Sequence, residues 1–224
     1  MFAIINIAIR AIAVLVLTIL AGLGIYKVLP EQIKLNVPFT SQAPEGVWTE
    51  PWQNACEEAS IIMIDNFYNG DSLTKDKAKT EILNIFDIKE KNFGPSMDES
   101  MQTVATIINN SNLGWTAQVV ENPTVEQLKT ELAAHQPIIV PVDGHKLNNP
   151  YYTDGGPDYH VLVVVGYDDT TEEFITHDPA TQFGQNFRYG YKLFYDAIND
   201  FLESDDLGTP TKRVLYTRPV LTTK

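Results

Sequence analysis

The sequence predicts an α+β fold in which helices pack on an antiparallel sheet. Stretches with helical periodicity come first along the chain, and short apolar runs separated by turn residues dominate its second half. A doubly wound parallel sheet would instead require strands and helices to alternate from the start. The expected helices are 55–68, 75–88, 97–109, 125–135 and 191–202. The expected strands are 116–120, 137–142, 160–167, 173–177 and 213–218.

The amino-terminal segment 1–29 predicts a transmembrane signal anchor. It has no charged residue from Ala11 to Tyr26, and a spanning helix needs roughly 20 mostly apolar residues. Arg10 would reach toward the interface, and the short flank before it favours a cytoplasmic N-terminus. The rest of this single-pass protein would then lie outside the cytoplasm, after a linker at 30–36. A cleaved signal peptide, which would release a secreted domain, is the alternative.

Composition suits one globular domain after the linker. The chain has 224 residues, of which 44% are hydrophobic and 20% are charged, enough to bury a full core. The stretch 37–219 contains no repeat and no low-complexity segment, so we expect a single domain there and a short tail at 220–224. The net charge of -13 repels phosphate backbones, which argues against a nucleic-acid partner.

The chain has one cysteine, Cys56, at the start of the first expected helix. Asn54 and Glu57 have the spacing of a capping box, which places Cys56 at the second helical position. The helix dipole there lowers the pKa of a thiol, and a free backbone N–H beside the sulfur can bind an oxyanion. The acidic residues Glu57 and Glu58 oppose thiolate formation, so a nearby imidazolium must outweigh them. By itself this segment fits a nucleophile and a small buried cysteine equally well.

A histidine and an aspartate lie at the same end of a predicted hairpin. His160 begins the apolar strand 160–167, and Asp178 directly follows the strand 173–177. A turn centred near Thr170 makes the two strands antiparallel and places His160 opposite Asp178, within about one residue. A carboxylate at that spacing can orient an imidazole and stabilise its charged form.

The order of the segments VPFTSQ, CEEAS, YHVLVVVGYD and THDPA resembles that of the papain-like cysteine peptidases related to the bacteriocin-processing, double-glycine-leader peptidases. The resemblance covers roughly residues 35–179 and implies a papain-like fold. The chain has no ATP-binding cassette, so the resemblance does not include the transporter part. The residues that match the working residues of the family are Gln42, Cys56, His160 and Asp178.

The resemblance implies that Cys56 attacks a peptide or amide bond while His160 serves first as base and then as acid. Asp178 would orient His160, and Gln42 would stabilise the oxyanion together with the backbone N–H of Cys56. Two features depart from the family pattern. Cys-Gly-Pro is replaced by Cys-Glu-Glu, and the distance from Gln42 to Cys56 is longer. The longer distance makes Gln53 the alternative oxyanion donor.

The expected activity is thus that of a thiol-dependent hydrolase, acting on a peptide or protein substrate without a cofactor. No HExxH, CxxC or HxH spacing occurs, so we expect no metal site. A non-catalytic peptide-binding module is one alternative, in which the glutamates after Cys56 would mark a decayed site on a retained fold. A cell-wall peptide amidase or transpeptidase is another, because acyl transfer of either kind would use the same triad. The aromatic segment 148–152 is a candidate substrate-side loop, and Arg188 and Tyr189 are expected to form an exposed pair.

Overall fold

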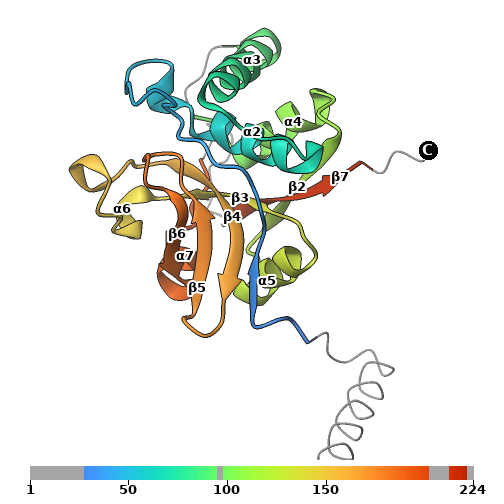
Figure 1. Cartoon of the computed structure of the whole chain (residues 1–224), viewed down its shortest axis with the longest axis vertical. Coiled ribbons are helices and arrows are strands. Elements are labelled where there is room, and N and C mark those ends of the chain that lie inside the picture. Colours follow the sequence, from blue (N-terminus) through green and yellow to red (C-terminus); the bar gives the residue numbers. More distant parts are fainter. Residues whose placement is uncertain (1–27, 95–97, 202–211, 221–224) are drawn as a thin grey trace, which may run out of the picture. The chain divides into compact units, whose positions relative to one another are not determined.

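The described residues form helices packed on an antiparallel sheet, which confirms the predicted α+β class (Figure 1). The computed structural model describes residues 28–94, 98–201 and 212–220. The helices are α2 (Cys56–Asn69), α3 (Lys75–Phe93), α4 (Met101–Asn110), α5 (Val125–Ala133), α6 (Gly144–Leu147) and α7 (Tyr191–Ala197). The strands are β1 (Gln32–Lys34), β2 (Trp115–Glu121), β3 (Ile138–Val142), β4 (His160–Asp168), β5 (Glu173–His177), β6 (Gln185–Gly190) and β7 (Arg213–Pro219).

The described strands pair in one antiparallel sheet of order β2-β7-β3-β4-β5-β6, and β1 also pairs with β4. β4 is the central strand of the site, and all of its residues are buried. Its continuous apolar sequence fits this position, because α2 and α5 both pack against it and leave no face for polar side chains. The sheet therefore fixes His160, the first residue of β4, deep in the domain.

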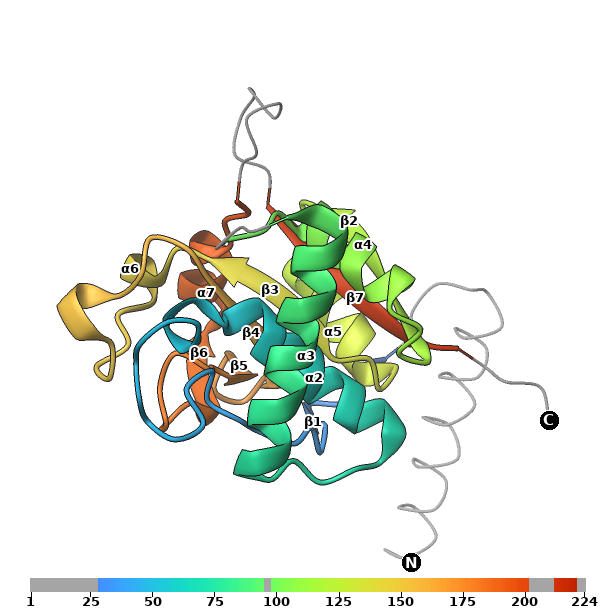
Figure 2. The ribbon, with the colours of Figure 1, turned by 90° about the horizontal axis from the view of Figure 1, so that it is seen from above.

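Helix α2 is buried on nearly every side, as its apolar sequence predicts. Ile61, Met63 and Ile64 are each at most 1% exposed. Figure 2 shows α3 and α2 in front of the strands, and contacts of α2 with both α3 and β4 place it between them. Gly70 ends the helix in the left-handed conformation (φ 72°), where its N–H bonds carbonyls of the last turn. This packing holds the first residue of the helix, Cys56, against the sheet.

Helix α4 begins later than predicted. The expected helix was 97–109, and residue 97 lies outside the described residues. Ser100 has extended backbone and its hydroxyl accepts a hydrogen bond from the Thr103 N–H, so it caps the helix. The Met101 N–H is satisfied by the carboxylate of Asp200 at 2.9 Å. A side chain from a distant segment thus helps to set where α4 starts.

Helix α7 is shorter than the predicted 191–202. It ends at Ala197, because Ile198 is extended (φ -55°, ψ 120°) and forms an antiparallel bridge with Val142 of β3. Pairing with the sheet overrides the helical tendency of the sequence at this point. Residue 202, the predicted end, lies outside the described residues.

The predicted linker at 30–36 contains a strand. β1 pairs with β4, and the second compact unit of the chain, Glu31–Lys224, begins with it. Gly166 permits this pairing, since a side chain there would lie 2.2 Å from the carbonyl oxygen of Ile33. β6 was not predicted either, because its residues are mostly polar and exposed. Both strands form because they pair with a neighbouring strand, and neither has an apolar pattern of its own.

The predicted transmembrane anchor at 1–29 lies almost wholly outside the described residues, which start at residue 28. Within the ranges that are described, no helix has the length and apolar character needed to cross a bilayer.

Candidate active site

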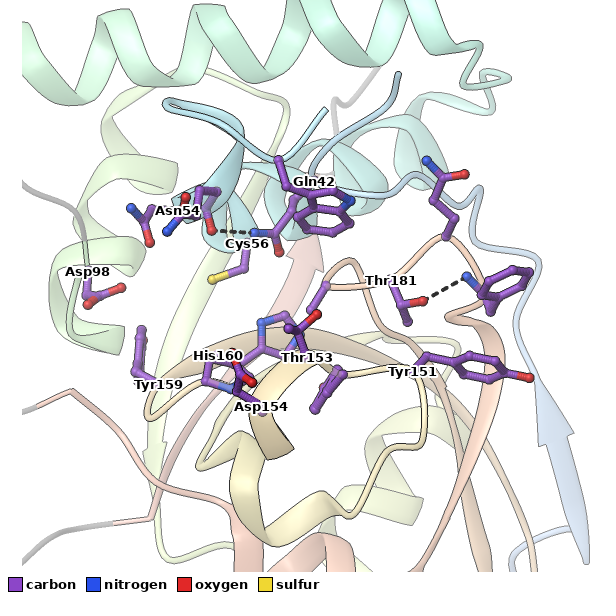
Figure 3. A pocket seen from close by; sticks show the side chains of 18 residues that line it. Gln42, Asn54, Cys56, Asp98, Tyr151, Thr153, Asp154, Tyr159, His160 and Thr181 are labelled. Carbon is purple, nitrogen blue, oxygen red and sulfur yellow. Dashed lines mark hydrogen bonds between the residues drawn. The ribbon is translucent and has the colours of Figure 1, made fainter. Parts of the chain in front are cut away.

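A cavity of about 610 Å³ brings distant parts of the sequence together. Its walls come from the loop before α2, the start of α2, the segment that leads into β4 and the loop after β5. Of the predicted site residues, Gln42, Cys56 and His160 line the cavity, and Figure 3 shows their side chains around one hollow. Asp178 is not part of the wall, because it is fully buried beside His160.

Cys56 is the first residue of α2, one position earlier in the helix than predicted. The predicted capping box is wrong: the residue that flanks the helix is Ala55, and no side chain caps the first turn. Asn54 belongs to a preceding 3₁₀ turn, Trp52–Asn54, and its amide donates to Glu50 at 2.7 Å. The first N–H groups of α2 therefore have no side-chain partner, and they lie beside the sulfur.

The thiol of Cys56 is held by its neighbour. Its Sγ donates to Glu57 Oε2 at 3.0 Å, and the other oxygen of Glu57 accepts from the Glu99 N–H at 3.1 Å. Burial raises the pKa of Cys56, the charge of Glu57 and this hydrogen bond raise it further, and a backbone hydrogen bond from Val161 opposes them. Burial, followed by the charge of Glu58, also raises the pKa of Glu57 to about 8. Burial and the two glutamates therefore favour the thiol over the thiolate in the resting site.

The second acidic neighbour, Glu58, is neutralised by a buried ion pair. Its carboxylate lies 3.0 Å from Lys89 Nζ, and the two side chains are 1% and 3% exposed. Lys89 Nζ is also 3.6 Å from a carboxylate oxygen of Glu99. An unpaired charge at this depth would be costly, so the lysine of α3 makes a buried glutamate tolerable next to the nucleophile position.

His160 and Asp178 form a buried hydrogen bond. The distance between His160 Nε2 and Asp178 Oδ1 is 2.9 Å, and the side chains are 2% and 0% exposed. Burial alone would raise the pKa of Asp178, but the charge of His160 and hydrogen bonds from His160, Tyr152 and Tyr189 lower it below the usual value. The carboxylate is thus ionised and fixed. His160 Nδ1 has no hydrogen-bond partner among the described residues, so this nitrogen remains available.

The strand register that brings them together differs from the predicted one by two residues. Val163 pairs with His177, so Asp178 continues opposite Leu162 rather than opposite His160. His160 and Leu162 share a face, which makes His160 and Asp178 a diagonal pair within reach of long side chains. The hairpin is centred later than the predicted pairing requires, because Asp168 pairs with Glu173. A bulge between Val164 and Gly166 inserts one residue into β4 and brings Asp178 one position closer to His160. His177 pairs with Val163 and therefore points to the other face.

The sequence can now be placed among known proteins. Residues 34–204 match the Peptidase C39 like family. The chain belongs to this family of cysteine peptidases. The resemblance expected from the motifs is therefore confirmed, and the match covers most of the C39-like domain, including all four predicted site residues.

Two solved structures share the fold. A protein from Bacillus anthracis assigned as a C39-like peptidase is 17% identical, with a TM-score of 0.54 over 84% of this chain and 98% of that one. Xylellain, a cysteine protease from Xylella fastidiosa, is 13% identical, with a TM-score of 0.50 over 87% and 88% of the two chains. At these identities the likeness establishes the fold alone. No protein with curated annotation matches the sequence significantly.

In the C39-like domain, the two candidate oxyanion donors have different environments. Gln42 is 4% exposed, and its Nε2 donates to the carbonyl oxygens of Gln53 (2.9 Å) and Trp52 (3.2 Å). Its backbone N–H bonds the carbonyl oxygen of Pro179, next to Asp178. Gln53 also lines the cavity, but its side chain is exposed and makes no hydrogen bond with a described residue. Of the two glutamines, only Gln42 has a side-chain amide that hydrogen bonds to described residues fix in place.

Three residues that sequence reasoning missed surround Asp178. Its Oδ2 accepts hydrogen bonds from the hydroxyls of Tyr152 (2.6 Å) and Tyr189 (2.7 Å) and from Asn149 Nδ2 (3.2 Å). Tyr152 also contacts the His160 ring edge-on, with centroids 6.0 Å apart. In the candidate substrate-side loop 148–152, Tyr151 and Tyr152 line the cavity, and Asn149 and Tyr152 also fix the carboxylate of Asp178.

The expectation that Arg188 and Tyr189 form an exposed pair is wrong for the tyrosine. Tyr189 is 3% exposed, because neighbouring residues of β6 point to opposite faces. Arg188 lies on the outer face, paired with Asp168 at 3.2 Å and Glu173 at 3.1 Å. Because β6 is not predicted, no sequence pattern assigns the two residues to different faces.

Proposed function

We propose that this chain is a thiol-dependent peptidase that hydrolyses peptide or amide bonds with a triad of Cys56, His160 and Asp178. The observation that carries the proposal is the buried hydrogen bond between His160 and Asp178 at a cavity that the single cysteine also lines. Membership of a cysteine peptidase family supports it. A carboxylate that holds Nε2 leaves Nδ1 as the nitrogen that would accept the thiol proton.

The first half of the reaction would form a thioester. The Cys56 thiol leaves its hydrogen bond with Glu57 and gives its proton to His160 Nδ1, and Sγ attacks the carbonyl carbon of the substrate. The negative oxygen would be stabilised by the backbone N–H of Cys56 and by Gln42 Nε2, once one of its two N–H groups turns from the carbonyl oxygen of Trp52 or Gln53 to the substrate. The imidazolium, stabilised by Asp178, then protonates the leaving amine as the C–N bond breaks.

The second half would restore the enzyme. His160, now neutral, takes a proton from water, and the resulting hydroxide attacks the thioester carbonyl. Collapse of the second tetrahedral intermediate breaks the C–S bond and releases a carboxylic acid. The proton returns from His160 to the sulfur, so Cys56 regains its thiol.

The contact with Glu57 predicts a resting thiol that is slow to react. Glu57→Gln removes the carboxylate that raises the pKa of Cys56, while the amide oxygen can still accept from the Glu99 N–H. We expect iodoacetamide to alkylate this variant about tenfold faster than wild type at pH 9, above the pKa of about 8 at which Glu57 ionises, because more thiolate is present. The chain has one cysteine, so added mass reports Cys56 alone. Equal rates would show that Glu57 does not control the thiol.

The oxyanion role is tested on the two glutamines of the cavity. Gln42→Ala should lower kcat by about 10²-fold, the usual cost of losing one oxyanion donor. Gln53→Ala is the matched control. It should leave kcat near the wild-type value, because the Gln53 side chain is exposed and has no hydrogen bond with a described residue. Initial rates on a fluorogenic peptide measure both. A larger loss in the Gln53 variant would reverse the assignment.

The proposal as a whole is tested by incubating the full-length chain with a peptide mixture and a thiol-directed covalent inhibitor. A peptidase would cleave the mixture and lose that activity as Cys56 gains the mass of the inhibitor. A module that only binds peptides would cleave none of them. An amidase or transpeptidase would release ammonia or join peptides rather than produce two hydrolytic fragments.

We further propose that the domain acts outside the cytoplasm on a single-pass anchor. The uncharged apolar stretch within 1–29 supports this location. On intact cells, an added protease should then degrade the domain, and protection of the domain would contradict the proposed orientation.

A further inference from the structure

One flank of the cavity is acidic, and the carboxylate of Asp98 there has no hydrogen bond or ion pair with a described residue. Asp154 also lines the cavity without such a partner, and it lies between Asp98 and Tyr151 in the view of Figure 3. Asp98 is half-buried, and burial raises its pKa. The charge of Lys89 acts on Asp98, but this lysine is buried and paired with Glu58. A half-buried carboxylate attracts a bound cation more strongly than a carboxylate in water does, because the local dielectric is lower.

The acidic flank continues into a second cavity of about 530 Å³. The two cavities share Asn54, Asp98, Pro157 and Tyr159 in their walls. The second adds Asp158, whose side chain is fully exposed and lies 3.1 Å from His145 Nε2. Neither cavity is lined by a lysine or arginine of the described part of the chain. The net charge of -13 adds a long-range field of the same sign, which favours the approach of cationic peptides.

The opposite flank is aromatic. Trp48, Tyr151 and Phe183 line the cavity while 40%, 51% and 67% exposed. The rings of Tyr151 and Phe183 lie together, with centroids 4.8 Å apart. Figure 3 shows Asp98 and Tyr151 at opposite ends of the view, with Cys56 and His160 between them. Exposed aromatic side chains gathered at a cavity are typical of surfaces that bind apolar groups.

We propose that the cavity selects peptides with a lysine or arginine on the Asp98 side of the cleaved bond and an aromatic or aliphatic residue on the Tyr151 side. This inference rests on the proposed peptidase function and names its substrate class. Peptides with acidic residues on the Asp98 side are disfavoured, because a second carboxylate there would be repelled without a cation to balance it.

The test is the digestion of a mixture of random peptides by the full-length chain, with the cleavage sites identified by mass spectrometry. Wild type should cleave sites with lysine or arginine at one position near the cleaved bond about tenfold more often than sites with aspartate or glutamate there. Asp98→Asn should remove most of this preference and keep the aromatic one. Phe183→Ala should weaken the aromatic preference and keep the basic one. Glu90→Gln, on the exposed surface of α3, is the charge-matched control and should change neither.

The outcomes separate the two claims. Cleavage without a preference for basic residues, or a preference that Asp98→Asn leaves unchanged, would overturn the inference and leave the peptidase proposal intact. If wild type cleaves no peptide, even though iodoacetamide labels Cys56, the peptidase proposal fails and the substrate class fails with it.

Discussion

Replacing Cys56 with alanine is expected to lower peptide hydrolysis by about 10⁶-fold, because the proposed mechanism has no other nucleophile. The fold should survive this change. The alanine leaves only a small void at a residue that is 5% exposed and removes one hydrogen bond, to Glu57. That hydrogen bond stabilises by about 1 kcal/mol, so the thermal midpoint should fall by roughly 2–4 °C. Hydrolysis rates and circular dichroism measure the two effects.

Ser60→Ala is the matched control for this experiment. Ser60 lies in the same helix, is fully buried, and bonds the Val161 carbonyl through its hydroxyl at 3.4 Å, but it does not line the cavity. Its removal should lower stability by a similar amount and leave hydrolysis near the wild-type rate. Hydrolysis retained by the Cys56 variant would mean that the chemistry takes place elsewhere.

The elements that the sequence predicted well are those that carry their own apolar pattern. The core of α2 and the apolar run after His160 specify a buried helix and a buried strand whatever surrounds them. β1 and β6 carry no such pattern, because they are edge strands added by pairing with β4 and β5. The end of α7 likewise depends on the pairing of Ile198 with β3. Such features are decided by tertiary contacts, which one sequence does not display.

The candidate site also contains residues that the sequence predicts and residues that it does not. Cys56 and His160 could be found because each begins a recognisable element, and Asp178 because it follows one. Their exact pairing could not, since neither the exact centre of the turn nor the bulge in β4 has a clear sequence signal, and both set the register. Nor could Tyr152 and Tyr189, which reach Asp178 from a loop and from an unpredicted strand. The sequence shows which reactive side chains lie at the ends of helices and strands. It does not show which side chains from distant segments surround them.

The second large effect is expected for Asp178→Asn, which should lower kcat by about 10³-fold or more. An amide has one oxygen and one nitrogen, whereas all five contacts of this carboxylate are with donors. If the amide nitrogen faces His160, it can donate to Nε2, which moves the ring proton to Nδ1 and prevents Nδ1 from accepting the thiol proton. If it faces Tyr152 and Tyr189, both hydroxyls lose their acceptor. Either orientation disables or loosens the site, and rates on a fluorogenic peptide measure the loss.

Stability should respond to pH in a way that identifies the carboxylate. The pKa of Asp178 is lower in the folded protein than the value of about 3.9 expected for an unfolded chain. Its contribution is therefore fully present above about pH 4 and is lost as the pH falls from there through the lowered folded pKa. The gap in thermal midpoint between wild type and Asp178→Asn should thus narrow below about pH 4. Asp168→Asn, at the far end of β4, should leave kcat unchanged, because its partner Arg188 lies outside the cavity. A gap that stays constant in acid would mean that Asp178 is not ionised in the folded state, and that His160 is oriented by something other than a carboxylate.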